Sequence, residues 1–301
     1  MPSRPAVPVV RARLEPANLK RSCDTLGRAL AHSVDEVLQA ELRRALEDGE
    51  IEAHFQPIAD MLSGDVVGVE ALSRWTHRTR GSVGPDVFVP IAEDDGLIVD
   101  LDRAVLRRSC AWAATWRRRH PADREIYVSV NVSSLQLQRP DFVADVVRAL
   151  TASGLPARLL VLEITERLMM LDTEMTLSQL RELKELGVRL ALDDFGTGFS
   201  SLSYLLRFPF DVLKIDRSFV RELGNHHGVP RVVSAIVALG DTLGLQCVAE
   251  GVERPSEVDA LIDVGCRLGQ GFYFGRPMPA AELEHHLSRV FSFPPGVARA
   301  S

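Results

Sequence analysis

Acidic and amide side chains follow a series of strand-like apolar runs. The segment Val69–Trp75 shows the plan, because it sets Glu70 and Arg74 directly behind apolar residues. In chain order, the groups at the ends of such runs are Gln56, Glu70, Asn131, Glu163, Asp193 with Asp194, Lys214, Glu250 and Gln270. Carboxylates gathered beside a few cationic side chains favour metal-dependent hydrolysis of an anionic substrate.

Asp193 and Asp194 are the sharpest metal-binding signal. Neighbouring like charges raise each other's pKa unless a cation lies between them, and one aspartate can bridge two ions while the other binds one. Gly196 and Gly198 allow the following loop to bend sharply. The alternative is that Asp194 caps the next helix and Asp193 forms a salt bridge. No H-E-x-x-H or C-x-x-C pattern is present, so Mg²⁺ or Mn²⁺ is favoured over Zn²⁺.

Further strand ends carry groups suited to a phosphate or a base. Lys214, beside metal-bound carboxylates, could orient or help deprotonate an attacking water. Glu250 and Glu253 follow one apolar run. Gln270 precedes an aromatic segment that could meet a planar base. Arg74 and Lys214 are the candidate cations for a phosphate.

The apolar runs alternate with helical patterns, which predicts an α/β fold. Strands are expected near Ala53–Ile58, Val66–Arg74, Ile126–Val132, Leu159–Ile164, Val188–Leu192, Val212–Ile215, Gln246–Ala249 and Leu268–Phe272. Helices are expected over Pro85–Arg119, Asp141–Ser153, Thr173–Leu186, Arg231–Leu243 and Ser256–Val264. Eight strands separated by helices predict a closed (β/α)₈ TIM-type barrel. Catalytic groups in that fold come from the C-terminal ends of several strands.

The barrel is expected to be irregular where it begins. The connection Asp60–Gly64 is too short for a crossover helix, so the first strand should pair antiparallel with the second. Residues 1–32 are expected to be a flexible extension, and residues 291–301 a tail. The barrel domain then covers residues 33–290, and its leading helix, residues 33–49, opens with a capping box between Ser33 and Glu36.

Composition narrows the class of protein. The net charge of −6 disfavours non-specific DNA or RNA binding, which rests on phosphate neutralisation. No apolar run approaches the roughly 18 residues of a membrane span, and the start is a poor signal peptide. A cytoplasmic location is therefore expected. The four widely spaced cysteines are expected to be free thiols.

The chain resembles the EAL-domain phosphodiesterases, bacterial enzymes that hydrolyse cyclic di-GMP. The motifs that carry the resemblance are Phe55-Gln56-Pro57-Ile58, Glu70-Ala71-Leu72 with Arg74-Trp75, Asn131-Val132-Ser133, Glu163-Ile164-Thr165-Glu166, the 193–201 loop, Lys214-Ile215-Asp216, Glu250-Gly251-Val252-Glu253 and Gln270-Gly271-Phe272. The resemblance covers residues 41–287 and implies the same barrel. It also implies hydrolysis to 5′-pGpG by a hydroxide that bridges two metal ions.

The resemblance further implies a role for each matching residue. The catalytic set is Glu70, Asp193, Asp194, Lys214 and Glu250. One ion would be held by Glu70, Asn131, Glu163 and Asp193, and the other by Asp193, Asp194 and Glu250. The substrate-binding set is Gln56, Arg74, Asp216, Glu253 and Gln270, with Arg74 at a phosphate. Glu166 would brace the loop after Asp194, which in this family is coupled to formation of a homodimer.

Two alternatives come from other functional classes. EAL-like domains that have lost activity act as cyclic di-GMP receptors or protein scaffolds, but such domains usually lack a ligand and this chain lacks none. A barrel hydrolase for a different phosphodiester is the other alternative. Turnover of cyclic di-GMP, and competition by linear and cyclic dinucleotides, would separate them.

Overall fold

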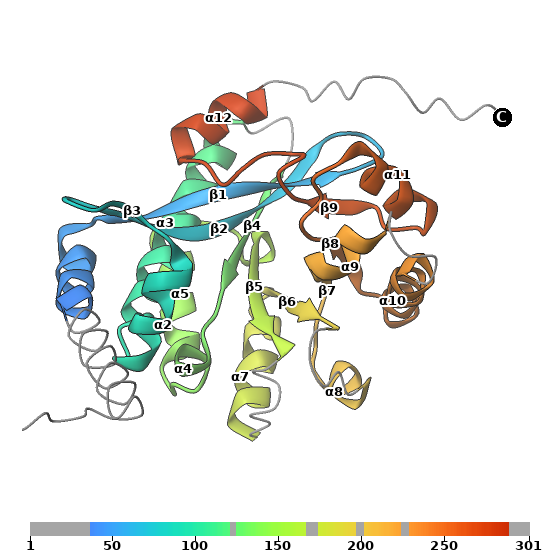
Figure 1. Cartoon of the computed structure of the whole chain (residues 1–301). Helices are drawn as coiled ribbons and strands as arrows, with labels where there is room; N and C mark the ends of the chain where they lie inside the picture. Colours follow the sequence, from blue (N-terminus) through green and yellow to red (C-terminus); the bar gives the residue numbers. More distant parts are fainter. Residues whose placement is uncertain (1–36, 121–124, 167–173, 197–201, 224–228, 289–301) are drawn as a thin grey trace, which may run out of the picture.

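Eight strands close into a barrel in the computed structural model of the chain, which describes residues 37–120, 125–166, 174–196, 202–223 and 229–288. The barrel strands are β1 (Ile51–Asp60), β2 (Val66–His77), β4 (Tyr127–Asn131), β5 (Leu160–Thr165), β6 (Arg189–Phe195), β7 (Val212–Ile215), β8 (Gln246–Ala249) and β9 (Leu268–Gln270). Neighbours run in the order β1-β9-β8-β7-β6-β5-β4-β2, and pairing of β1 with β2 closes the wall. The predicted (β/α)₈ barrel is confirmed, and Figure 1 shows its strands surrounded by helices.

Strand β1 runs against the direction of the other barrel strands. It is antiparallel to β2 and β9, whereas the remaining neighbours in the wall are parallel. Its short connection, Asp60–Gly64, makes the predicted hairpin, and Gly64 has φ +77°, which glycine adopts without strain. The register pairs Gln56 with Glu70. The strand β3 (Gly81–Val83) was not predicted; it pairs with β2 beyond the barrel wall.

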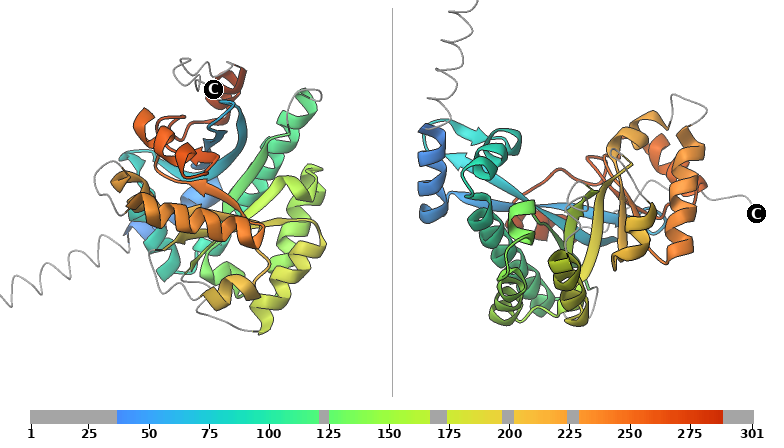
Figure 2. Two further views of the ribbon diagram at one scale, coloured as in Figure 1. Left: turned by 90° about the vertical axis from the view of Figure 1, so that its right-hand side faces the viewer. Right: turned by 90° about the horizontal axis from the view of Figure 1, so that it is seen from below.

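The helices cover the outside of the strands, as Figure 2 shows from two further directions. They are α2 (Pro85–Asp94), α3 (Ile98–Arg119), α4 (Ser134–Leu137), α5 (Phe142–Ser153), α7 (Glu174–Glu185), α8 (Leu202–Arg207), α9 (Arg217–Glu222), α10 (Val229–Leu243), α11 (Pro255–Asp263) and α12 (Ala280–Ser288), with a 3₁₀ turn at Ala157–Leu159. The prediction of a single helical region over Pro85–Arg119 was wrong in one respect. Gly96, at φ +73°, divides it into α2 and α3.

The leading helix covers residues 37–48 and lies against the barrel beside β2 and β3 (Figures 1 and 2). Leu38 and Leu42 are buried in the main core. On the polar side, a carboxylate oxygen of Glu41 lies 3.3 Å from Nε2 of His77, at the end of β2. Apolar burial and this polar contact therefore attach the helix to the same strand that carries the Glu-Ala-Leu motif.

Several predictions fall outside the described residues. These are the capping box of Ser33 and Glu36, the extension of residues 1–32, the tail of residues 291–301, and Cys23. The other three cysteines, Cys110, Cys247 and Cys266, are buried free thiols, as predicted. Within the described part of the chain, none of the helices has the length and apolar character that a bilayer crossing requires.

Candidate active site

An apolar layer fills one end of the barrel interior and sets the position of the polar groups above it. The layer contains Ile58, Tyr127, Val161, Ala191, Val212, Val248 and Leu268. Side chains alternate between the two faces of a strand, so the residue two positions away also points inward. Two positions from these residues, toward the C-terminal ends of the parallel strands, stand Gln56, Ser129, Glu163, Asp193, Lys214, Glu250 and Gln270. We call this end of the barrel the cup. Strand periodicity therefore gathers the predicted groups at one end of the barrel.

Lys214 lies at the centre of four carboxylates and is 2 % exposed. Its Nζ is 2.6 Å from an oxygen of Glu250, 2.7 Å from Glu163, 3.3 Å from Asp193 and 3.4 Å from Glu70. These residues come from five different strand ends. The lysine is thus an internal counter-ion that holds the carboxylates together.

Three amide side chains fix the orientation of Glu70. Gln270 Nε2 donates to Glu70 Oε2 at 2.6 Å and to Gln56 Oε1 at 3.1 Å. Asn131 Nδ2 donates to the other oxygen of Glu70 at 2.8 Å. Gln56 Nε2 in turn donates to the carbonyl of Gly275 at 3.1 Å. Both oxygens of Glu70 therefore have donors, which favours the ionised form.

The site carries more negative charge than Lys214 can offset. Burial and repulsion from Glu70 hold the pKa of Glu163 well above its ordinary value. Burial also raises the pKa of Glu250, to about 8, and that of Asp194. Burial opposes ionisation of Glu70, but Lys214 and the amide hydrogen bonds outweigh it, so the pKa of Glu70 is lowered. Burial likewise opposes the charge on Lys214, yet the carboxylates raise its pKa. Divalent cations would relieve this excess of negative charge.

Asp193, Asp194 and Glu250 are placed to share one cation. One ligand oxygen from each lies within 4.8 Å of the others. Asp194 has φ +55°, an uncommon conformation for a residue with a side chain, and both aspartates line the same cavity. Oδ1 of Asp193 is buried and accepts no hydrogen bond within the described residues. Oxygen donors of this kind suit Mg²⁺ or Mn²⁺. In the other predicted set, the carboxylates of Glu70, Glu163 and Asp193 contact Lys214, and Asn131 donates to Glu70.

Two cavities open over the strand ends and meet at Leu72. The first has a volume of about 540 Å³ and is lined by Gln56, Glu70, Asp193, Asp194, Asp216, Glu250, Glu253 and Gln270, among others. The second has a volume of about 560 Å³ and is lined by Arg74, Glu93, Asp102, Asn131, Ser133 and Thr165, among others. The cup is therefore two-lobed, with its acidic floor in the first lobe.

The remaining predicted substrate-binding residues lie on the walls of these lobes. Arg74 is half-buried in the second lobe. Asp216 lines the first lobe and also caps α9, because its Oδ1 accepts the backbone N–H of Ser218 at 2.9 Å. Glu253 is exposed on the rim of the first lobe, 3.8 Å from Arg221. Their roles in binding stay predictions.

Glu166 is half-buried just beyond β5. The loop that it is predicted to brace, residues 197–201, lies outside the described residues. That role, and the dimer contact expected beside it, also stay predictions.

Sequence reasoning missed four charged residues that line the lobes, Arg217, Arg221, Glu93 and Asp102. Arg217 and Arg221 stand on α9 in the wall of the first lobe, and the position of Arg217 directly after Asp216 was a usable signal. Asp102, from α3, lines the second lobe and accepts the backbone N–H of Ser133 at 3.1 Å. Burial raises the pKa of Asp102 to about 7. It sits inside a long helical pattern, where nothing in the sequence distinguishes it.

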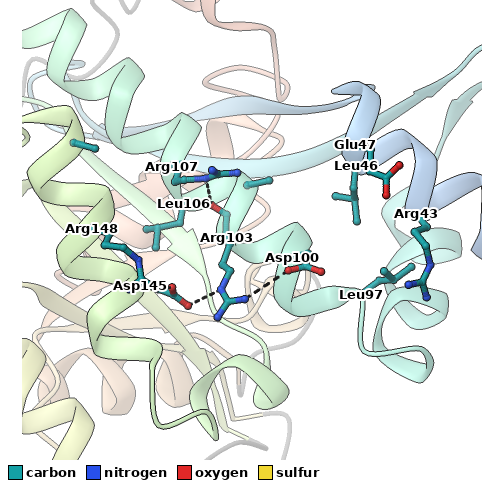
Figure 3. A pocket seen from close by; sticks show the side chains of 12 residues that line it. Arg43, Leu46, Glu47, Leu97, Asp100, Arg103, Leu106, Arg107, Asp145 and Arg148 are labelled. Atoms are coloured by element: carbon teal, nitrogen blue, oxygen red, sulfur yellow. Dashed lines mark hydrogen bonds and ion pairs between the residues drawn. The ribbon is translucent and has the colours of Figure 1, made fainter.

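A larger cavity, of about 710 Å³, lies away from the strand ends, between the leading helix, α3 and α5 (Figure 3). Three of the four arginines that line it are paired with nearby acids, and the fourth, Arg107, donates to the carbonyl of Arg103. Arg103 Nε donates to Asp145 at 2.6 Å, Arg148 pairs with the same carboxylate, and Arg43 lies 2.7 Å from Asp95. Because these charges neutralise one another, we assign the chemistry to the two-lobed cup.

Comparison with known proteins agrees with this geometry. The family model described as the EAL domain matches residues 39–277. A cyclic di-GMP phosphodiesterase of Pseudomonas aeruginosa, NbdA, is 44 % identical over 257 residues, which cover 85 % of this chain and 32 % of that protein. The bifunctional diguanylate cyclase/cyclic di-GMP phosphodiesterase MucR of the same organism is 44 % identical over 81 % of this chain and 35 % of its own length. The chain thus spans about a third of these relatives.

Solved structures show the same likeness. The PaMucR phosphodiesterase in complex with cyclic di-GMP has a TM-score of 0.77 and 43 % identity, and the match covers 81 % of this chain and 98 % of that one. The EAL domain of FimX from Pseudomonas aeruginosa, bound to cyclic di-GMP, has a TM-score of 0.70 and 26 % identity, over 79 % of this chain and 95 % of that one. The barrel, the matched motifs and these relatives together establish that the chain belongs to the EAL domain family.

Proposed function

We propose that the chain hydrolyses cyclic di-GMP to linear 5′-pGpG and requires two divalent cations, Mg²⁺ or Mn²⁺. One observation carries the proposal: four carboxylates surround a single buried lysine on the floor of the cup, and a fifth, that of Asp194, lies beside two of them. Purely structural packing has little use for such an excess of buried charge, because burial of unpaired charges is costly. Cations and an anionic substrate give it a function.

The shape of the cup supports a cyclic dinucleotide. Two lobes of similar volume, about 540 and 560 Å³, meet at Leu72, and the substrate has two equivalent nucleotide halves. Arg217 lines one lobe and Arg74 the other, so each lobe offers a guanidinium to a phosphate. The relatives named for cyclic di-GMP hydrolysis support the same substrate.

The donor set fits the proposed cations. Asp193, Asp194 and Glu250 would hold one ion, and Glu70, Asn131, Glu163 and Asp193 the other, with Asp193 shared. When bound, such ions lower the pKa of water and offset charge on the entering and leaving oxygens. Oδ1 of Asp193 has an ion pair with Lys214 but no hydrogen bond, and the pKa of Glu250 is raised; a site short of positive charge should show both features.

The chain's own side chains would position the reactants. Lys214 keeps the carboxylates together and has donor hydrogens to orient a water beside them. Gln270 and Asn131 hold Glu70 ionised and fixed. Arg74 would hold a phosphate from the side of the second lobe. The apolar layer under these polar groups closes the interior of the barrel at that end. Water would therefore reach the bound phosphate only through the open mouth of the cup.

Turnover of cyclic di-GMP by the purified chain in Mg²⁺ and then Mn²⁺ tests the proposal, with Glu70→Ala alongside. We expect pGpG as the product, and its loss in the variant. The conservative variant Asp65→Asn, altered in the hairpin at the opposite end of the barrel, should keep full activity. Saturable binding of cyclic di-GMP without turnover would replace the proposal with a receptor function. Neither binding nor turnover would reject the substrate.

We also propose residues 33–290 as the catalytic domain, with residues 1–32 and 291–301 as extensions. The described body, residues 37–288, supports these bounds. The cytoplasmic location and the homodimer stay predictions.

A further inference from the structure

Ser129 is a buried polar side chain in the floor of the cup. It lies in β4 and is 1 % exposed. Because it stands two positions from Tyr127 of the apolar layer, its side chain points into the barrel. Its Oγ donates to Oε1 of Glu163, on the adjacent strand β5, at 2.5 Å. A serine hydroxyl thus contacts one of the predicted cation ligands.

The hydrogen bond from Ser129 holds the Glu163 carboxylate in one orientation. The last torsion of a glutamate side chain has broad minima, so donors must fix the carboxylate. Lys214 donates to Oε2 of Glu163 at 2.7 Å, but it is shared with three other carboxylates. A hydroxyl has a single hydrogen to donate, and Glu163 receives it. Ser129 is therefore the donor that serves this carboxylate alone.

Strand β4 orients two carboxylates, one on each side. Asn131, two residues after Ser129, donates to Glu70 at 2.8 Å, and Ser129 donates to Glu163. Glu70 and Glu163 come from β2 and β5, the two neighbours of β4. We call the two proposed ions the Glu163 ion, with ligands Glu70, Asn131, Glu163 and Asp193, and the Asp194 ion, with ligands Asp193, Asp194 and Glu250.

Ser129 does not occur among the described residues that line the two lobes. Any effect of its hydroxyl on the reaction must therefore pass through Glu163. Groups that hold metal ligands in place commonly contribute about tenfold to a hundredfold to metal affinity.

We propose that Ser129 is a positioning residue, whose hydroxyl fixes the Glu163 carboxylate and thereby sets the affinity of the cup for the Glu163 ion. The inference rests on the proposed function of the same site. The Asp194 ion and the binding of substrate should not depend on Ser129.

Binding of Mn²⁺ to metal-free protein, without substrate, tests the proposal through the electron paramagnetic resonance signal of the free ion. Ser129→Ala should weaken one of two bound ions about tenfold to a hundredfold and leave the other as in wild type. In an Asp194→Asn background, which impairs the Asp194 ion, the same change should weaken the ion that remains. Ser129→Thr keeps a hydroxyl and should restore the affinity. Two ions bound by Ser129→Ala as tightly as by wild type would overturn the inference.

The matched control is Ser109→Ala. Ser109 is a fully buried serine of α3, and its Oγ has no hydrogen-bond partner within the described residues. This variant should bind both ions as wild type does. Urea unfolding in EDTA identifies a merely structural role, because Ser129→Ala would then lose stability and keep the wild-type affinity for Mn²⁺.

Steady-state kinetics separate failure of this role from failure of the proposed function. Ser129→Ala should need about tenfold to a hundredfold more Mn²⁺ for half its maximal rate, with KM for cyclic di-GMP unchanged at saturating Mn²⁺. If wild type turns over cyclic di-GMP and Ser129→Ala has the same Mn²⁺ dependence, only the positioning role is wrong. If wild type turns over no cyclic di-GMP, the proposed function fails, and the inference fails with it.

Discussion

Replacement of Lys214 by methionine should destabilise the metal-free protein strongly. The change keeps an apolar stem of similar length and removes the ammonium that lies 2.6 Å from Glu250 and 2.7 Å from Glu163. With an effective dielectric constant of about 20, each such pair attracts by about 6 kcal/mol, although burial removes hydration from both partners. Breaking a buried pair costs about 3–5 kcal/mol, because the partner's charge is left uncompensated.

The assay is urea unfolding at pH 8 in EDTA, with thermal melts beside it. A loss of 3–5 kcal/mol corresponds to a drop in Tm on the order of 10 °C for a domain of this size. The carboxylates of Glu163 and Glu250 already have raised pKa values, and without the lysine these rise further. Each takes up a proton as the pH falls and then needs no counter-ion, so the loss should be smaller at pH 5 than at pH 8.

Divalent cations should partly replace the missing ammonium. A ligand that binds only the folded state at a hundred times its Kd adds about 2.7 kcal/mol, so Mn²⁺ should stabilise Lys214→Met at least as much as wild type. The matched control is Lys184→Met, which removes the partly exposed pair with Asp211 and should cost below about 1 kcal/mol. Equal stability of Lys214→Met and Lys184→Met, or no response of the former to Mn²⁺, would refute the reasoning.

Three further predictions follow from individual contacts. Folding raises the pKa of Asp102 from 3.8 to about 7, so the contribution of this residue to stability is full at low pH and is lost as the pH rises. Relative to wild type, Asp102→Asn should therefore gain about 2–3 kcal/mol in free energy of unfolding between pH 5 and pH 8. A difference in urea unfolding that does not depend on pH would contradict this. Gly271→Ala should lower the free energy of unfolding by about 1–3 kcal/mol or more, because the new methyl group overpacks against Val252. The control Gly81→Ala has positive φ but open space around it, so it should lose only the backbone strain of about 1–2 kcal/mol. Equal shifts in Tm would show that the turn at Gly271 moves to accept the methyl group. Arg74→Gln should raise KM for cyclic di-GMP about tenfold by loss of a charge-assisted phosphate contact, and an unchanged KM in steady-state kinetics would remove Arg74 from the substrate site.

The sequence was sufficient for the barrel and for the carboxylates, amides and lysine on the floor of its cup. Side chains alternate between the two faces of a strand such as Leu160–Thr165, so Glu163 must share a face with Val161 of the apolar layer. The antiparallel first hairpin followed from the length of Asp60–Gly64 alone. Local patterns carry this information because strand periodicity is a local property.

Tertiary contacts were harder to predict. Asp102 reaches the second lobe only because α3 packs across the end of β4, and its helical pattern gives no sign of that. The strand Gly81–Val83 is too short to show alternation. The direct packing of Gly271 on Val252 joins two segments that the sequence does not connect. Such features depend on which elements meet in space.

The initial rate of pGpG formation by metal-stripped protein, followed as Mn²⁺ is added, tests the two-cation phosphodiesterase most directly. The account predicts no product in EDTA, a rate that rises with more than first-order dependence on Mn²⁺, and no recovery in Asp193→Asn. Turnover of cyclic di-GMP that persists without divalent cations, or survives in Asp193→Asn, would contradict it.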